Sequence, residues 1–252
     1  MEYAQILLDG RTRMDVAIER IKAFEPPEGY YLAFSGGKDS TVIYHLAVMA
    51  NVKFDAHYAQ VGIDPPELVQ HIKRYYPDVE RHTQHPSIWQ LVEKKGLPRR
   101  QARWCCELLK ENGGSGRIVI TGLRWAESHR RRQRRMFEVC RKEAAKRYLH
   151  PIIDWNNAEV WAFIHDHQLP YCSLYDEGFT RLGCVMCPMQ GPRQVAIERQ
   201  RWPKLSEAWR RAAIRYWERQ TDGGKKFPDG DSFFRWWLIR RKVTRADQCV
   251  MF

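Results

Sequence analysis

The chain has 252 residues, a formal net charge of +12, 44% hydrophobic residues and 29% charged residues. This balance is typical of a globular protein, and the length allows one full-sized α/β domain with a smaller appended region. The sequence has no run of 18 apolar residues, and its first residues lack the basic and apolar stretches of a signal peptide. We therefore expect a cytoplasmic protein with no membrane span.

Strands and helices are expected to alternate along the first half of the chain. Helical spacing of apolar residues predicts a helix over 11–24, and short apolar or β-branched runs predict strands. The predicted strands are Tyr30–Phe34, Phe54–Gln60 and Ile118–Gly122, and helices are expected over Thr41–Met49 and Pro66–Tyr75. This alternation favours a Rossmann-like, doubly wound parallel sheet, whose ligands bind beyond the carboxyl ends of the strands.

The composition changes after about residue 190. Helices are expected over 204–219 and 232–242, separated by Gly223 and Gly224, in a basic region rich in tryptophan. The predicted organisation is an N-terminal helix (1–27), a nucleotide-binding domain (28–192) and a helical extension (193–252).

A glycine loop joins the first strand to the following helix. Its residues are Ser35, Gly36, Gly37, Lys38, Asp39, Ser40 and Thr41. Glycines allow positive φ and close backbone approach, and amides at a helix N-terminus form a cradle for an anion. Lysine and serine add a cation and hydroxyl donors, and Asp39 suits bracing of the loop or Mg²⁺ binding. The alternative is an ordinary helix cap made by Asp39 and Ser40.

This loop resembles the PP-loop of the ATP pyrophosphatase superfamily, whose members act at the α-phosphate of adenine nucleotides. Within that superfamily the chain is most similar to the phosphoadenosine phosphosulfate (PAPS) reductase family, over about residues 28–193. Besides the loop, the matching positions are Gly62, Pro66, Glu67, Thr121, Gly122, Arg124, Glu127 and Ser128. The resemblance implies that Gly62, Gly122, Arg124, Glu127 and Ser128 join the loop in binding the nucleotide, and that Lys38, Asp39 and Arg124 are catalytic.

Two further predictions concern residues near this site. Arg124 follows a strand, where its guanidinium could grip a phosphate or sulfate bidentately; the alternative is a surface salt bridge. Asp64 and Glu67 are either substrate or metal contacts or caps of the next helix.

Four cysteines have the spacing of a metal site, namely the tandem Cys105 and Cys106 and the later pair Cys184 and Cys187. Four thiolates suit a tetrahedral Zn²⁺ or an iron–sulfur cluster, and a tandem pair is awkward for a single zinc. Cluster-containing members of the PAPS reductase family resemble this pattern, which implies a 4Fe–4S cluster. Zinc and free thiols remain the alternatives. Charge from Arg103 and Lys110 is expected near the site, whereas Cys140 and Cys172 are expected to be buried apolar residues.

Most of the positive charge belongs to the second half. Residues 124–147 hold ten Lys and Arg against three acidic residues, and residues 193–245 hold fifteen against six. This suggests a polyanionic partner or substrate, with DNA and tRNA as candidates, and Arg130 or Arg131 could reach the nucleotide. The alternative for the arginine-rich segment 129–135 is a solvated basic surface. The tryptophans at 202, 209, 217, 236 and 237 alternate with arginines, which fits either base stacking or, as we favour, one buried helix face.

Three function classes fit these features. The favoured one is an ATP pyrophosphatase that adenylates a nucleic acid or another acceptor with Mg²⁺, followed by sulfur transfer from a donor protein. The second is a PAPS or adenylyl sulfate (APS) reductase that uses a thioredoxin-like reductant, with Cys249 as the nucleophile. The family's C-terminal Glu-Cys-Gly-x-His segment is incomplete here, because Gly and His are absent after Cys249. The third is a non-catalytic, cluster-bearing subunit that binds nucleic acid.

Overall fold

The computed structural model of the protein describes residues 10–221 and 224–239. Its contacts divide the chain into two compact units. The first unit contains residues up to Gln60, Asp64–Thr83 and Asn112–Gly183, and the second contains Val61–Ile63, Gln84–Glu111 and residues from Cys184 onward. Each unit is described by itself.

The first unit is built on a six-stranded sheet with the order β3-β2-β1-β4-β6-β5. The strands are β1 (Tyr30–Ala33), β2 (Phe54–Gln60), β3 (Glu80–Thr83), β4 (Ile118–Ile120), β5 (Phe137–Val139) and β6 (Arg147–Leu149). All neighbouring pairs are parallel except β5 with β6. The expected parallel sheet is thus confirmed with one antiparallel edge, because the short segment between β5 and β6 cannot make the crossover that a parallel pair requires.

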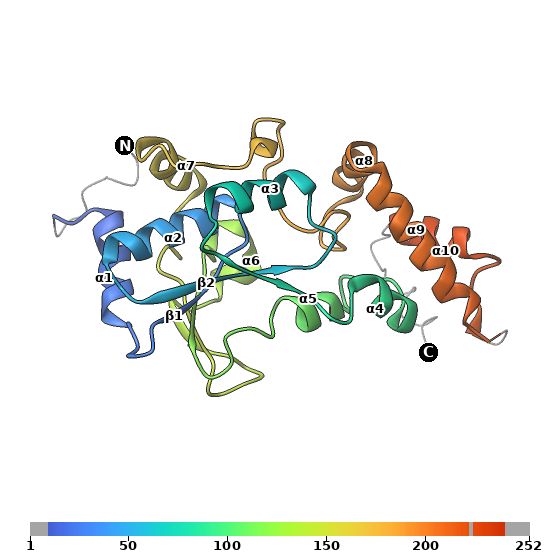
Figure 1. The fold of residues 1–252 in the computed structure, drawn as a ribbon, viewed down its shortest axis with the longest axis horizontal. Helices are drawn as coiled ribbons and strands as arrows, with labels where there is room; N and C mark the ends of the chain where they lie inside the picture. Colours follow the sequence, from blue (N-terminus) through green and yellow to red (C-terminus); the bar gives the residue numbers. More distant parts are fainter. Residues whose placement is uncertain (1–9, 222–223, 240–252) are drawn as a thin grey trace. The chain divides into compact units, whose positions relative to one another are not determined.

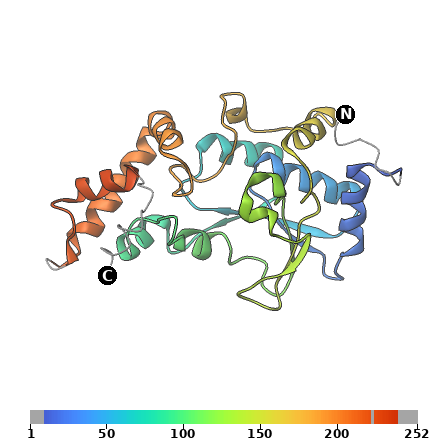
Figure 2. The same cartoon turned by 180° about the vertical axis from the view of Figure 1, so that it is seen from behind.

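Helices α1 (Arg13–Ala23), α2 (Lys38–Ala50), α3 (Pro66–Tyr75) and α7 (Asn157–Asp166) belong to this unit. Figures 1 and 2 show α2, α3 and α7 on one side of strands β1 and β2. Helix α1 begins with a capping box between Thr12 and Asp15 and buries Ala17 and Ile21. The remaining short helices of this unit are η1 (Trp125–Glu127), α6 (His129–Arg132) and η2 (Ser173–Tyr175).

Several elements follow the sequence-based expectation closely, and two differences matter. Strand Phe54–Gln60 and helix Pro66–Tyr75 have the predicted bounds. Helix α2 begins at Lys38 rather than near Thr41, because Gly37 is its N-cap, so Lys38 and Asp39 stand in its first turn. Strand β3 was not predicted, because its sequence Glu-Arg-His-Thr lacks the apolar alternation of a half-buried strand.

The second unit is helical where it is described. Its helices are α4 (Ile88–Lys95), α5 (Trp104–Leu109), α8 (Pro192–Arg201), α9 (Pro203–Glu218) and α10 (Gly230–Ile239). Helix α9 packs against α4 and α10, and the pair α9 and α10 is seen from behind in Figure 2. The predicted residues 240–242 and Gly223 lie outside the described residues. No helix of the described part is long and apolar enough to span a membrane.

Tryptophans form the core of this helical unit. Trp209 is fully buried, and its ring centroid lies 5.3 Å from that of Trp89 and 5.1 Å from that of Trp237. Trp202 and Trp237 are buried too, whereas Trp236 is 36% exposed. The favoured interpretation, a buried aromatic face, is therefore confirmed for Trp202, Trp209 and Trp237.

Candidate nucleotide site and cysteine site

The glycine loop meets helix α2 without a capping side chain. The N-cap is Gly37, which has no side chain to cap the first turn. The hydroxyl of Ser40 instead donates to the Gly37 carbonyl over 2.9 Å and accepts from the Ser35 amide over 3.2 Å. The alternative of an ordinary cap by Asp39 and Ser40 is therefore wrong. A helix N-terminus without a capping residue presents backbone amides and the positive end of the helix dipole to a ligand.

Gly36 is the loop residue that requires glycine. Its φ is +68°, and an added Cβ would lie 2.7 Å from Cγ1 of Ile72 and 2.8 Å from Cδ1 of Leu68, both on α3. Gly37 has a φ of −83°, so only Gly36 of the two loop glycines uses the positive φ that glycine allows. A Cβ at Gly37 would instead come 3.4 Å from the Tyr175 hydroxyl.

Lys38, Asp39 and Arg124 form one charged network. Nε of Arg124 donates to Oδ1 of Asp39 over 2.8 Å, and Nζ of Lys38 lies 3.2 Å from Oδ2 of the same carboxylate. Arg124 is 2% exposed and also donates from Nη1 to the Trp155 carbonyl over 3.2 Å. The surface salt bridge considered for Arg124 is thus excluded, and Asp39 braces the loop as its position indicated.

The segment after β4 packs directly on the loop. A Cβ at Gly122 would lie 2.7 Å from the backbone carbon and oxygen of Asp39, so only glycine allows this approach. The preceding Thr121 shares a 2.7 Å hydrogen bond between Oγ1 and Nδ1 of His150. Burial lowers the pKa of His150 to about 4, although Glu138 opposes this shift, so the imidazole is neutral near pH 7.

Glu127 and Ser128 have local structural contacts. Oε2 of Glu127 accepts a 3.0 Å hydrogen bond from the Arg124 amide and forms an ion pair with Arg131. Ser128 is the N-cap of α6 and accepts from the Arg131 amide. The side chain of Arg131 is therefore engaged by Glu127, and Arg130 is exposed.

Tyr175 is a site residue that no sequence motif indicated. Its hydroxyl, on η2, accepts a 2.9 Å hydrogen bond from the amide of Lys38, which lies 137 positions away in the sequence. Burial raises the pKa of Tyr175, so the phenol is protonated near pH 7. A neutral hydroxyl oxygen thus accepts the hydrogen bond of the first amide of α2, at the position where anions bind to a helix N-terminus.

The predicted site residues Gly62, Asp64 and Glu67 are divided between the two units. Asp64 is 7% exposed and Glu67 stands in the first turn of α3, whose N-cap is Pro65. Gly62 belongs to the second unit, has a φ of +84° and leaves open space around an added Cβ.

The four candidate metal-binding cysteines lie together within the second unit. Cys105 and Cys106 stand in the first turn of α5, and Cys184 and Cys187 flank a turn closed by a 3.2 Å hydrogen bond between their backbones. All four are partly buried. Met186, inside the turn, has a φ of +59°, a conformation unusual for a residue with a side chain.

Three contacts hold this turn in place. The Val185 amide donates to the Ile63 carbonyl over 2.8 Å, and Nε1 of Trp209 donates to the Val185 carbonyl over 3.3 Å. The Met186 amide donates to Oε2 of Glu198 over 2.5 Å, and Glu198 is 3% exposed. The turn is therefore anchored by side chains of α8 and α9.

The thiols of the tandem pair are electrostatically coupled. The hydrogen bond from Cys105, and then the charges of Arg103 and Lys110, lower the pKa of Cys106 to about 6 against the effect of burial. The pKa of Cys105 is raised by that same hydrogen bond, by burial and by the charges of Cys106, Cys184 and Cys187. The thiol of Cys105 thus lies within electrostatic reach of the other three cysteines, and Arg103 and Lys110 supply charge at Cys106 as expected.

The other cysteines differ from one another. Cys172 is 1% exposed, as predicted, whereas Cys140 is only partly buried, so the expectation of burial is wrong for Cys140. Cys249, the candidate nucleophile of a reductase, lies outside the described residues.

A mostly parallel sheet with a glycine-lined helix N-terminus beyond β1 defines an α/β protein of the nucleotide-binding type. The model of the phosphoadenosine phosphosulfate reductase domain matches residues 29–190. The chain belongs to this family.

Comparisons with individual proteins agree with this assignment. The chain is 33% identical over 135 residues to adenosine 5'-phosphosulfate reductase of Allochromatium vinosum, covering 48% of this chain and 52% of the relative. It is 31% identical over 182 residues to a probable FAD synthase of Schizosaccharomyces pombe, covering 69% of this chain and 67% of the relative. A phosphoadenylyl-sulfate reductase of Candida auris, solved with phosphate, shares the fold with a TM-score of 0.52 and 18% identity, covering 70% of this chain and 90% of that one. Three relatives are matched over 43%, 46% and 52% of their length, so the chain spans about half of each.

Proposed function

We propose that this chain binds ATP at the loop Ser35–Thr41 and transfers its adenylyl group to an acceptor, in a reaction of sulfur modification. The observation that carries the proposal is the N-terminus of α2, whose N-cap Gly37 has no capping side chain, beside the ion pair of Asp39 with the buried Arg124. Family membership supports an adenine nucleotide as the substrate, and the similarity to an FAD synthase supports ATP as that nucleotide.

The charge balance at the loop favours a polyanion. Lys38 and Arg124 contribute two positive charges, and Asp39 contributes one negative charge, all at the positive end of the α2 dipole. Because Lys38 and Arg124 are 6% and 2% exposed, water screens their charges poorly. A phosphate chain would balance this excess.

The proposed step is a displacement at the α-phosphorus. An oxygen of the acceptor forms a bond to the α-phosphorus, the bond from that phosphorus to the bridging oxygen of the β-phosphate breaks, and pyrophosphate leaves with the electron pair. The loop amides, Lys38 and Arg124 would stabilise the charge on the departing pyrophosphate. A sulfur nucleophile from a donor then displaces AMP.

The four cysteines fit a 4Fe–4S cluster as the bound group. Around a single Zn²⁺ at about 2.3 Å, four sulfurs would lie about 3.8 Å from one another. In the part of the chain that the structure describes, no three of these sulfurs lie within 4.8 Å of one another. Cys105, Cys106, Cys184 and Cys187 would hold the cluster, which would supply electron transfer or sulfur ligation.

The second unit offers a surface for a polyanionic acceptor. A pocket of about 240 Å³ is lined by Trp89, Ala208, Arg211 and Arg215. An indole beside guanidinium groups suits a base and a phosphate, which supports a nucleic acid as the acceptor.

Sulfonucleotide reduction is the second candidate function, and similarity to an adenosine 5'-phosphosulfate reductase favours it. It requires a thiolate that attacks the sulfur of the sulfonucleotide and a thiol reductant that releases sulfite. Cys249 is the proposed nucleophile, so a Cys249→Ser variant should lose sulfite release and keep any pyrophosphate release.

One experiment separates the two reactions. Anaerobically purified protein is incubated with ATP and Mg²⁺ plus tRNA or DNA, or with PAPS or APS plus thioredoxin. Pyrophosphate release supports adenylylation, and sulfite release supports reduction. Lys38→Ala should abolish the observed reaction, whereas Lys53→Ala, an exposed lysine of the same unit, should leave it unchanged. Equal loss in both variants, or neither product, would refute a catalytic role for the loop.

A further inference from the structure

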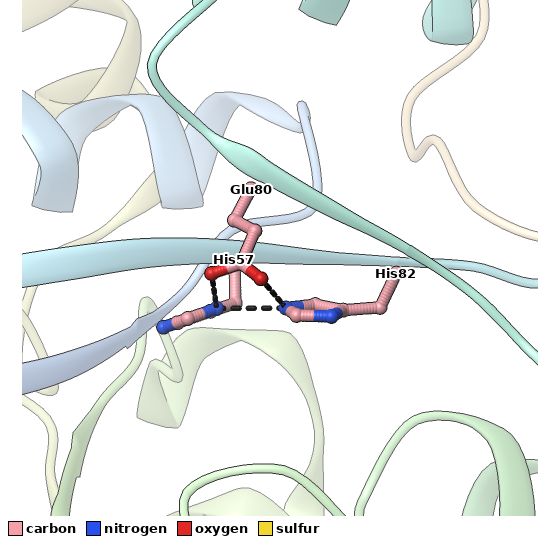
Figure 3. A group of neighbouring side chains, drawn as sticks. All are labelled: His57, Glu80 and His82. Carbon is pink, nitrogen blue, oxygen red and sulfur yellow. Dashed lines mark hydrogen bonds and ion pairs between the residues drawn. The ribbon is translucent and has the colours of Figure 1, made fainter.

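We propose that His57, Glu80 and His82 form a binding site for a first-row divalent metal ion such as Zn²⁺. His57 lies on β2 and the other two residues on β3, and all three side chains project from the same face of the sheet towards one point (Figure 3). Their ligand atoms lie within 4.8 Å of one another. The site belongs to the first unit and shares no residue with the nucleotide loop or the cysteines.

The register of the two strands produces this arrangement. His57 is directly opposite Glu80, and His82 follows two positions later on β3, on the same face as Glu80. The three donors therefore come from neighbouring positions of a parallel pair rather than from a sequence motif. This placement explains why the sequence alone gave no indication of the group.

The distances between donors suit a tetrahedral ion. Nδ1 of His57 lies 2.8 Å from Nε2 of His82 and 3.4 Å from Oε2 of Glu80. Nε2 of His82 lies 3.8 Å from Oε1 of Glu80. Donors at about 2.0–2.2 Å from a tetrahedral Zn²⁺ lie about 3.4 Å apart. The two imidazoles must separate by a few tenths of an ångström to reach this spacing, and the His82 side chain is 38% exposed.

His57 is already oriented as a metal ligand. Its Nε2 hydrogen-bonds a carboxylate oxygen of Asp55, so Nε2 carries the proton and Nδ1 presents its lone pair to His82 and Glu80. A carboxylate behind a ligating histidine fixes the tautomer and orientation of the ring, and its loss typically weakens metal binding about 10–100-fold.

Further contacts hold the Asp55 carboxylate and the His57 ring in position. Arg117 binds both oxygens of Asp55, over 2.7 Å from Nη1 and 2.5 Å from Nη2. The Tyr31 ring stacks on the His57 ring with centroids 4.1 Å apart and planes 6° apart. A bound ion would fasten the edge strand β3, only four residues long, to β2. We therefore assign the ion a structural role.

The visible absorption spectrum of bound Co²⁺ distinguishes binding at this site from binding at the cysteines. Holoprotein with its cysteine site reconstituted anaerobically is titrated with Co²⁺ and followed by visible absorption. Ligation by imidazole and carboxylate gives ligand-field bands without sulfur-to-cobalt charge transfer. We expect one equivalent to bind with ligand-field bands alone, and added Zn²⁺ to displace it. Zn²⁺ should also raise the Tm.

Variants assign the ligands. His82→Gln should weaken Co²⁺ binding at least tenfold and remove the effect of Zn²⁺ on Tm, and Asp55→Asn should weaken binding about 10–100-fold. His85→Gln, an exposed histidine just after β3, should match the unaltered protein. Unchanged affinity in His82→Gln, equal losses in His85→Gln, or charge-transfer bands alone would overturn the proposal and leave His57 and His82 as a hydrogen-bonded pair only.

Discussion

Arg124 and Asp39 are joined by a 2.8 Å hydrogen bond that links the segment after β4 to the first turn of α2. The guanidinium is 2% exposed, and the carboxylate also pairs with Lys38. One buried contact thus fixes the positions of two parts of the candidate site that are distant in sequence. The contribution of this contact to the free energy of unfolding and its contribution to nucleotide binding can be measured separately.

Replacing Arg124 tests this contact. Arg124→Met removes the hydrogen bond to the Asp39 carboxylate, which keeps Lys38 as a charged partner, and losing such a charged hydrogen bond costs about 1.5–3 kcal/mol of unfolding free energy. Arg11→Ala breaks an exposed pair with Glu19 and should cost less than about 1 kcal/mol. Urea unfolding monitored by tryptophan fluorescence compares the two. Equal small losses would show that Arg124 does not stabilise the loop.

Gly36→Ala should destabilise the protein through two effects. A φ of +68° is unfavourable for alanine, and the new Cβ would clash with Ile72 and Leu68. Gly62→Ala is the matched control, since its φ of +84° is equally unfavourable but its surroundings are open. We expect about 1–2 kcal/mol for Gly62→Ala from backbone strain alone and a clearly larger loss for Gly36→Ala. Similar Tm values for the two variants would contradict the packing of the loop on α3.

Tyr175→Phe tests whether the tyrosine hydroxyl competes with phosphate. The Tyr175 hydroxyl accepts a hydrogen bond from the Lys38 amide, and a hydrogen bond of this kind contributes about 0.5–1.5 kcal/mol to stability. If a phosphate takes that amide, removing the hydroxyl should tighten ATP and pyrophosphate binding about 2–12-fold by calorimetry. Tyr171→Phe, whose hydroxyl bonds Asp176, should have no effect. Weaker binding in Tyr175→Phe would indicate that the hydroxyl contacts the nucleotide itself.

The free energy of unfolding should decrease as the solution becomes more acidic, because the folded protein buries neutral histidines. Burial lowers the pKa of His71 from 6.5 to about 4, so between these values the unfolded state binds more protons than the folded state. The free energy of unfolding therefore decreases as the pH drops from about 6.5 to about 4. His71→Leu should flatten this slope in thermal melts, whereas His129→Leu, at an exposed position, should not. An unchanged slope in His71→Leu would exclude this histidine as a cause.

Metal analysis tests the cysteine site. Cys187→Ser should lower iron and acid-labile sulfide well below four of each per chain, while Cys172→Ser, a buried cysteine of the other unit, should retain them. The absorption spectrum of the anaerobic protein provides an independent readout. One zinc and no sulfide in the unaltered protein would favour the tetrahedral alternative.

Local sequence patterns were sufficient for the elements that depend on local interactions. The bounds of β2 and α3 follow from apolar periodicity and from proline at the start of a helix. The glycine loop followed by a helix also indicated the anion site. Strands β3, β5 and β6 were missed, because a polar edge strand and strands of three residues carry little periodic signal.

The sequence by itself determined the family, the parallel sheet and the residue types of both candidate sites, because these depend on short motifs and on chain connectivity. Only the tertiary structure decided which side chains meet. It paired Arg124 with Asp39, brought Tyr175 to the Lys38 amide and set His57 opposite Glu80. Such contacts join residues far apart in the chain, and their geometry follows from strand order, register and close packing, which no local pattern encodes.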